Sequence, residues 1–149
     1  MEIDFVKYKN KALLGAAAKK SAVIGLALAM LLCFFGCVGY TSKYKAVGFI
    51  HSNDTESATM SFHTLEGRMV FKLKATSESD IKYSAKLESG SATVYYDIYG
   101  KCELFSINGG EELDSRNGYV DNGTIYIIVE TDGKCTNGEF SFSINAPNE

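Results

Sequence analysis

An uncharged segment of twenty residues, Ser21 to Tyr40, constrains this chain more than any other feature of its sequence. Residues 22–38 within it contain only Ala, Val, Ile, Leu, Met, Phe, Cys and Gly. These seventeen residues are at the lower limit of what spans a hydrocarbon core of about 30 Å as a helix. A helix of a soluble domain normally carries a polar stripe, and this segment has none. The segment therefore predicts a hydrophobic helix that enters a membrane.

The charges around this segment predict its orientation. Residues 1–20 hold five lysines and two acidic residues, a net charge of +3. Basic residues stay on the cytoplasmic side of a membrane. We therefore expect residues 1–20 to form a basic cytoplasmic leader, residues 21–40 to form the signal or transmembrane helix, and the rest to lie at the extracytoplasmic face of the cell membrane.

Three fates of the hydrophobic segment are open. Release by an ordinary signal peptidase is disfavoured, because no Ala-x-Ala-like site follows the apolar run. The residues Phe34-Phe35-Gly36-Cys37 resemble the lipobox of bacterial lipoproteins, in which a small residue precedes the cysteine that ends an apolar region. That resemblance implies that Cys37 receives a diacylglyceryl group and becomes the first residue after cleavage. The third fate is an uncleaved single span, which the length of the leader favours.

The part of the chain after Cys37 has 112 residues, enough for one domain with a core of its own. It carries ten Lys and Arg against sixteen Asp and Glu, a net charge of −6. This balance excludes a nucleic-acid-binding domain and disfavours binding to anionic lipid surfaces. We expect a short linker at residues 41–45 and one extracytoplasmic domain at residues 46–146.

Apolar and polar residues alternate with a period of two through most of this domain, and no stretch of it has a helical period. Residues with a preference for positive φ separate the runs, as in Asn122-Gly123, Asp132-Gly133 and Asn137-Gly138. The pattern predicts eight strands and a short ninth piece near residues 118–121; the eight are 46–51, 57–63, 68–76, 81–88, 92–99, 102–107, 124–131 and 138–145.

Eight short antiparallel strands predict an all-β fold, an antiparallel β-sandwich of the jelly-roll type, preceded by one N-terminal hydrophobic helix. From Leu65 on, the layout is also similar to the pre-peptidase C-terminal domains of secreted bacterial peptidases. The matching pieces are Val94-Tyr95-Tyr96-Asp97, the turn at Gly100, the strand from Gly123 to Ile127, and Phe140-Ser141-Phe142. That resemblance implies an accessory module without catalysis.

The histidines and acidic residues predict no catalytic or metal centre. His51 and His63 fall at the far ends of two consecutive strands, about 20 Å apart if these strands form a hairpin. No nucleophile motif accompanies them, so we expect no enzyme activity and no cofactor. Weak calcium candidates crowd a loop predicted between residues 108 and 123, but they fit no EF-hand and we expect a solvated loop; they are Glu111, Glu112, Asp114 and Asp121.

Two cysteines remain in the domain, Cys102 and Cys135. Outside the cell they could pair. If residues 111–121 add a full strand between them, they fall at opposite ends of the sandwich and cannot bond, since Cα separations beyond about 7 Å are not bridged. Without that strand they share an end. Two separate thiols is the reading that we prefer.

Several aromatic residues fall opposite the expected core, namely Tyr95, Tyr99, Phe105 and Tyr126. Exposed tyrosines can form platforms that bind sugars or peptides. We expect most of them to be covered instead. The sequence thus predicts a membrane-anchored, non-catalytic binding or structural module of the cell envelope, with a cell-wall, glycan or protein ligand. The alternative is an uncleaved single-span protein with an external sensing or interaction domain.

Overall fold

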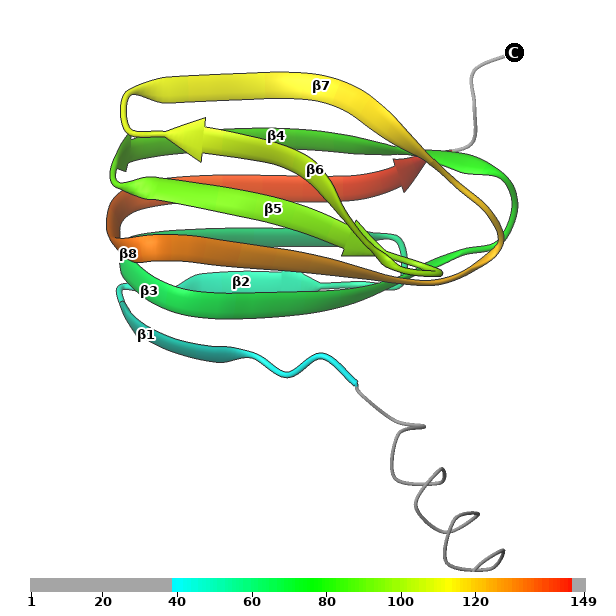
Figure 1. Ribbon diagram of the computed structural model, residues 1–149, viewed down its shortest axis with the longest axis horizontal. Coiled ribbons are helices and arrows are strands. Elements are labelled where there is room, and N and C mark those ends of the chain that lie inside the picture. The colour runs from blue at the N-terminus through cyan, green and yellow to red at the C-terminus, as the bar shows by residue number, and fades with distance from the viewer. Residues whose placement is uncertain (1–38, 146–149) are drawn as a thin grey trace, which may run out of the picture. The chain divides into compact units, whose positions relative to one another are not determined.

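The computed structural model describes residues 39–145, without the side chains of Arg116 and Asn117 (Figure 1). The leader and the hydrophobic segment as far as residue 38, Cys37 included, lie outside the described residues. Within residues 39–145, no helix has the length and apolar character needed to cross a membrane. The described part of the chain is all-β.

Eight antiparallel strands make up this part of the chain (Figure 1). They are β1 (Lys43–Val47), β2 (Ile50–Asn53), β3 (Ser57–Ala75), β4 (Ser79–Ser89), β5 (Ser91–Asp97), β6 (Lys101–Asn108), β7 (Glu111–Val120) and β8 (Gly123–Asn145).

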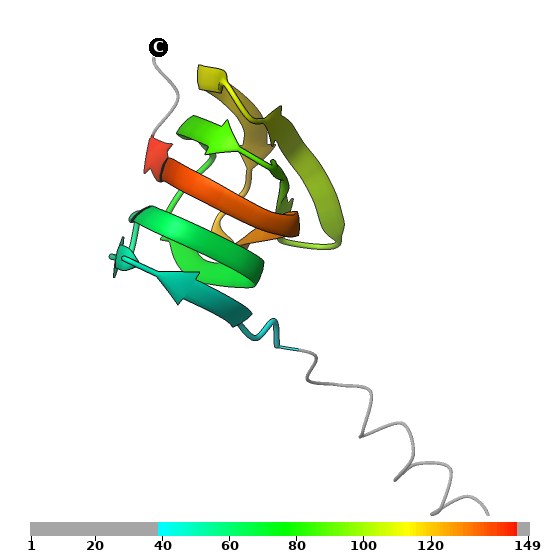
Figure 2. The same ribbon diagram turned by 90° about the vertical axis from the view of Figure 1, so that its left-hand side faces the viewer.

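The strands form a β-sandwich of two layers (Figure 2). The first, the β4–β7 layer, has the order β2, start of β3, end of β8, β4, β7. The second, the β5–β6 layer, has the order end of β3, start of β8, β5, β6. Because β3 and β8 run through both layers, the pairing is that of one open antiparallel sheet folded over itself. This strand order is that of a jelly roll.

The two longest strands were each expected as two strands with a turn between them. The runs expected at 57–63 and 68–76 belong to one strand, β3, which ends at Ala75, and the runs expected at 124–131 and 138–145 belong to one strand, β8. Two positive-φ residues expected in turns, Gly133 (φ 76°) and Asn137 (φ 44°), instead bend β8, and Gly67, with φ of 120°, bends β3. At Gly67 a side chain would also collide with the backbone of β1. Residues with positive φ can therefore bend a continuous strand as well as form the turn between two strands.

Two further expectations about the strands were wrong. The run 46–51 is two strands, because Gly48 has φ of 58° and interrupts it. The loop expected between residues 108 and 123 is the edge strand β7, which pairs with β4 along its whole length. The short ninth piece near residues 118–121 is the end of this strand.

The core lies between the two layers and is filled by alternate residues of the long strands. Phe71 from β3 and Phe142 from β8 lie at its centre, with ring centroids 6.3 Å apart. Tyr83 from β4 stacks on Phe105 from β6 at 4.5 Å, which joins the layers. Ring contacts of this kind add to the stabilisation from buried area. The core is therefore continuous from one layer to the other.

Candidate binding site

A tyrosine-lined hollow lies at the end of the sandwich where β5 turns into β6 and β7 turns toward β8. Its volume is about 290 Å³. Tyr99 is 85% exposed and Tyr119 is 58% exposed, and these are the most exposed aromatic side chains among the described residues. The hollow is lined by Tyr96, Ile98, Tyr99, Gly100, Cys102, Tyr119 and Asp121.

Hydrogen bonds to the Asp97 side chain stabilise the turn that carries Tyr99. The backbone N–H of Gly100 donates a hydrogen bond of 2.8 Å to Oδ1 of Asp97, and the hydroxyl of Tyr40 donates to Oδ2 of the same side chain. The Asp97 carboxylate thus connects the turn to residues that precede β1 in the sequence. An Asp at the start of a turn that accepts an N–H further along is a common turn stabiliser.

Two carboxylates surround the hydroxyl of Tyr119. The hydrogen bond with Glu78, together with the negative charges of Glu78 and Asp121, raises the pKa of Tyr119 to about 12. The hydroxyl is protonated at physiological pH, as that of any tyrosine is, and donates to the Glu78 carboxylate. The site offers aromatic faces for apolar contact and carboxylate oxygens that accept hydrogen bonds.

A polar groove runs over the outer surface of the β4–β7 layer. Three adjoining hollows of about 570, 620 and 230 Å³ form it. Hydroxyls of Ser61, Ser84 and Ser141 line it, and its charged side chains include Lys86 and Glu112, which are 3.5 Å apart and largely exposed. Such exposed pairs contribute little to stability. The groove has no exposed Phe or Tyr among its lining residues, and the exposed apolar side chain that it offers is Ile50.

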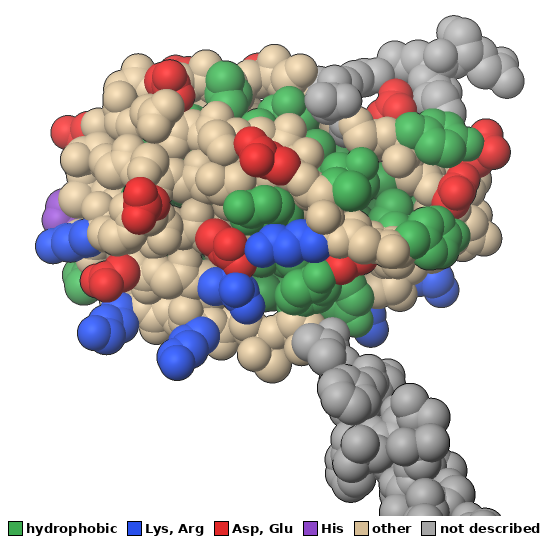
Figure 3. Space-filling model, viewed as in Figure 1, with side chains coloured by type: hydrophobic (Ala, Val, Ile, Leu, Met, Phe, Trp, Pro, Cys, Tyr) green, Lys and Arg blue, Asp and Glu red, His purple; other side chains and the backbone are tan. Residues whose placement is uncertain are grey.

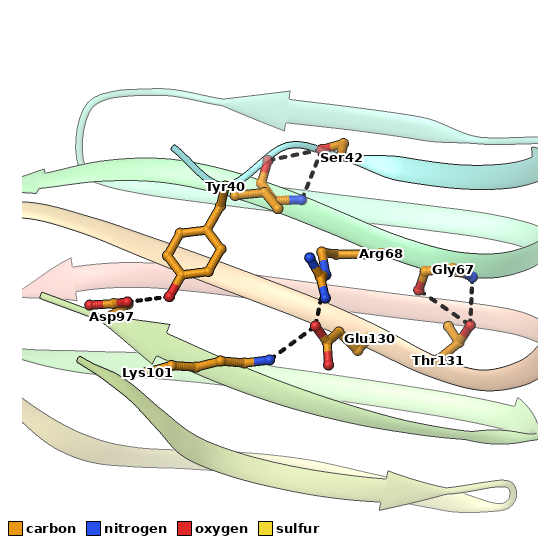
Figure 4. Close-up of polar contacts among 9 residues, drawn as sticks. Tyr40, Ser42, Gly67, Arg68, Asp97, Lys101, Glu130 and Thr131 are labelled. Atoms are coloured by element: carbon orange, nitrogen blue, oxygen red, sulfur yellow. Dashed lines mark hydrogen bonds and ion pairs between the residues drawn. The ribbon is translucent and has the colours of Figure 1, made fainter. Parts of the chain in front are cut away.

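The outer surface of the β5–β6 layer carries an ionic network instead (Figure 4). Oε1 of Glu130 lies 2.7 Å from Nε of Arg68 and 3.0 Å from Nζ of Lys101. Nζ of Lys101 also lies 3.8 Å from the ring centroid of Tyr95. Burial alone would raise the pKa of Glu130, but the hydrogen bond and charge of Lys101 and the charge of Arg68 together lower it. The network covers this surface with groups that already have partners.

The histidines lie on neighbouring strands but in different surroundings. His51 on β2 is opposite Met60, three residues from His63 along β3, or about 10 Å. The separation of about 20 Å expected from a hairpin with residue 63 opposite residue 46 was wrong, because residue 46 is opposite Leu65 and the pairing lies two residues further along β3. Nδ1 of His63 donates a 2.7 Å hydrogen bond to Oδ1 of Asn137. In the described residues, no hydrogen bond joins a histidine to a serine, threonine or cysteine side chain.

The acidic residues expected on a loop do not gather at one point. Glu111, Glu112 and Asp114 lie on β7, where successive side chains alternate between faces. Asp121 follows the strand, at the other end, in the tyrosine-lined hollow. Oε2 of Glu111 accepts a 2.6 Å hydrogen bond from the backbone N–H of Asn108. Residues 39–145 hold no cluster of three or more metal-ligating side chains.

The two cysteines of the domain are free. Cys102 is exposed in the hollow, beside the β5–β6 turn. Cys135 is buried at the bend of β8, where its Sγ lies 3.2 Å from the carbonyl oxygen of Ser91 at the opposite end of β5. Because β7 forms a full strand, the two thiols lie at opposite ends of the sandwich. This is the arrangement expected from the sequence if residues 111–121 add a strand between them.

The four aromatic residues considered from the sequence have three different environments. Phe105 is in the core, since a bulge beside Val94 turns both Leu104 and Phe105 inward. Tyr95 and Tyr126 are half-buried, under Lys101 and Tyr40 respectively. Tyr99 is exposed in the hollow. Sequence reasoning missed Tyr119, because it placed most of residues 108–123 in a loop, and it missed Glu78, which lies between β3 and β4 and hydrogen-bonds Tyr119.

Comparison with known proteins gives structural similarity only. No protein-family model and no curated protein matches the chain. The carbohydrate-binding module TmCBM61, solved in complex with β-1,4-galactotriose, is 17% identical, with a TM-score of 0.40 over 70% of this chain and 82% of that one. The pre-peptidase C-terminal domain of collagenase from Bacillus anthracis is 15% identical, with a TM-score of 0.42 over 71% and 100%. A family 29 carbohydrate-binding module, CBM29-2, is 14% identical, with a TM-score of 0.37 over 72% and 78%.

Fold and surface together define an antiparallel β-sandwich module with an aromatic hollow at one end. Its described residues bring no nucleophile next to a base and no three metal ligands together.

Proposed function

We propose that this chain is a lipoprotein of the cell envelope, anchored through Cys37, whose β-sandwich binds a glycan in the tyrosine-lined hollow and catalyses no reaction. The observation that carries the proposal is the pair of exposed tyrosines, Tyr99 and Tyr119, beside the carboxylates of Glu78 and Asp121.

A sugar ring fits the chemistry of this hollow. Its C–H face packs on an aromatic ring, and its hydroxyls donate to carboxylate oxygens. The volume of about 290 Å³ is near the lower limit of ordinary ligand pockets, which suits one or two sugar residues at a chain end. The fixed turn at Asp97 and Gly100 reduces the entropy lost when Tyr99 is immobilised by a ligand.

The test is binding of the full chain in detergent to an array of glycans and peptidoglycan fragments. We expect Tyr99→Ala and Tyr119→Ala each to weaken the binding of any positive glycan by tenfold or more. Tyr44→Ala is the matched control, because Tyr44 is partly exposed outside the hollow. A blank array, or equal loss in all three variants, would exclude glycan binding at this site.

The anchor is supported by the sequence alone, through the apolar segment and its Gly36-Cys37 end. Two or more acyl chains hold a domain of this size firmly, whereas one chain gives only reversible binding. Labelling with radioactive palmitate in a bacterial host tests it. We expect label in the wild type and in Cys33→Ala, and none in Cys37→Ala. Equal label in all three, or none in any, would exclude lipidation at Cys37.

A second candidate is an uncleaved single-span protein whose external domain senses a ligand. The basic leader of twenty residues favours it, since it is long for a lipoprotein signal. An intact N-terminus on the mature membrane-bound protein would establish this candidate against the first.

A further inference from the structure

The basic residues of the extracytoplasmic domain are segregated along the sequence and in the fold. Residues 41–50 and 67–75 hold five Lys and Arg and no Asp or Glu. The rest of the chain after Cys37 holds the other five cations and all sixteen acidic residues. The net charge of −6 is therefore the sum of two unlike parts: residues 41–50 and 67–75 together carry +5, and the other residues after Cys37 carry −11. The five cations are Lys43, Lys45, Arg68, Lys72 and Lys74.

These five residues lie on two adjacent strands and form what we name the basic edge. β1 pairs with β3 so that Lys43 is opposite Arg68. Beyond this point, Met69, Phe71, Leu73 and Ala75 are buried, so Lys72 and Lys74 point away from the core. Figure 3 shows much of the blue surface along the lower border of the molecule, where Figure 1 has β1 and β3.

Most of the basic edge is free of ion pairs. Arg68 is paired with Glu130. Among the described residues, Lys43, Lys45, Lys72 and Lys74 have no carboxylate within ion-pair distance. Four exposed ammonium groups therefore face solvent on this side, and one carboxylate, that of Glu66, is opposite Lys45 in the β1–β3 register but outside ion-pair distance.

The chain enters the sandwich beside this edge. Ser42 Oγ accepts a 3.0 Å hydrogen bond from the backbone N–H of Val70, between Arg68 and Lys72 on β3. The hydroxyl of Tyr40 donates to Asp97, and its ring centroid lies 5.5 Å from that of Tyr126 (Figure 4). Residues 40–42 are thus fixed against the β5–β6 layer, and only three covalent steps separate Tyr40 from Cys37. Three residues reach at most about 10 Å.

We propose that the basic edge lies against anionic phospholipid headgroups, so that the sandwich has a fixed orientation on the membrane. This inference rests on the proposed anchor at Cys37. A tether of about 10 Å keeps the entry point within about one Debye length of the surface at physiological ionic strength. Basic residues at that distance from anionic lipid are attracted, while the acidic remainder of the domain is repelled.

The test is lysine acetylation of the full lipidated chain in lipid nanodiscs, followed by mass spectrometry of its peptides. One set of discs contains equal parts of phosphatidylglycerol and phosphatidylcholine, and the other phosphatidylcholine only. We expect acetylation of Lys43, Lys45, Lys72 and Lys74 to be slower by about fivefold in the anionic discs. Salt at about 1 M, where the Debye length is about 3 Å, should remove the difference.

Lys82 and Lys86 on β4 are the internal control, because they line the groove on the other layer. Their acetylation should be the same in both sets of discs. The double variant Lys72→Gln, Lys74→Gln should reduce the protection of Lys43 and Lys45, and Lys82→Gln, Lys86→Gln should leave it unchanged. Equal acetylation of the basic edge in both sets would overturn the orientation while the anchor stands. Failure of the anchor is seen separately, as loss of the protein from both sets when discs are reisolated.

Discussion

The ring of Phe62 lies directly over Gly138, its partner across β3 and β8. A Cβ placed on Gly138 would come within 2.7 Å of Cε1 of Phe62. Phe62 is buried and stacks on Phe140 with centroids 6.2 Å apart, so its ring has little room to move aside. We therefore expect Gly138→Ala to destabilise the fold by about 1–3 kcal/mol through overpacking. Urea denaturation monitored by circular dichroism measures this change.

Gly100 provides the matched control for that substitution. It has no heavy atom within 4 Å of an added Cβ and no positive φ. Gly100→Ala should therefore change the free energy of unfolding by less than about 0.5 kcal/mol. Equal effects at both positions would mean that loss of glycine, rather than the contact with Phe62, is responsible.

The sequence predicts the all-β class and most of the core, because alternation with a period of two survives wherever one face of a strand is buried. It fails where that signal is weak. In β7 only Leu113 and Val120 are apolar, since this edge strand pairs with β4 alone. It also fails at the bends of β3 and β8, because a glycine such as Gly67 serves a bend as well as a turn.

Only part of the candidate site could be predicted from the sequence, for the same reason. Tyr99 follows a strand with a clear pattern, so its exposure could be anticipated. Tyr119 lies on β7 and Glu78 lies between β3 and β4, and only the three-dimensional structure brings them together. The basic edge was not predicted, because the net charge of the residues after Cys37 is the sum of two regions of opposite sign.

Glu130 should stabilise the sandwich in a pH-dependent way. Burial opposes its ionisation, but Lys101 and Arg68 lower the pKa in the folded state below the value of 4.5 for a free side chain. A depressed pKa contributes stability above the unfolded pKa, and this contribution is lost as the pH falls through the folded pKa. Glu130→Gln should cost up to about 1 kcal/mol at neutral pH, because both cations are partly exposed. The difference from wild type should shrink below pH 4.5 in thermal unfolding.

Glu112→Gln is the control for that experiment. Its partner Lys86 is 3.5 Å away, and the two side chains are 71% and 63% exposed. We expect no measurable change in stability at any pH, since exposed pairs of this kind contribute little. A loss as large as that of Glu130→Gln would indicate a general effect of net charge rather than the network around Glu130.

The cysteines of the domain should differ sharply in reactivity. Burial raises the pKa of the Cys135 thiol, and its side chain is inaccessible, whereas Cys102 is exposed. Since the thiolate is the reactive form, iodoacetamide should modify Cys102 in the native protein and Cys135 only after unfolding. Peptide masses distinguish the two positions. Modification of both at similar rates in the native protein would contradict the buried environment of Cys135.

Tyr119 should ionise later than an ordinary tyrosine. The hydrogen bond to Glu78, with the charges of Glu78 and Asp121, raises its pKa from 10.0 to about 12. A pKa that is raised in the folded state contributes stability below the unfolded pKa, and this contribution is lost as the pH rises from 10.0 toward 12. The difference in tyrosinate absorbance between wild type and Tyr119→Phe isolates this residue. Glu78→Gln should shift that difference titration toward pH 10.0, while Glu88→Gln, on the far end of β4, should leave it in place. Asp121→Asn should weaken a glycan bound in the hollow, because Asp121 lines the hollow and a ligand hydroxyl would lose a charged acceptor.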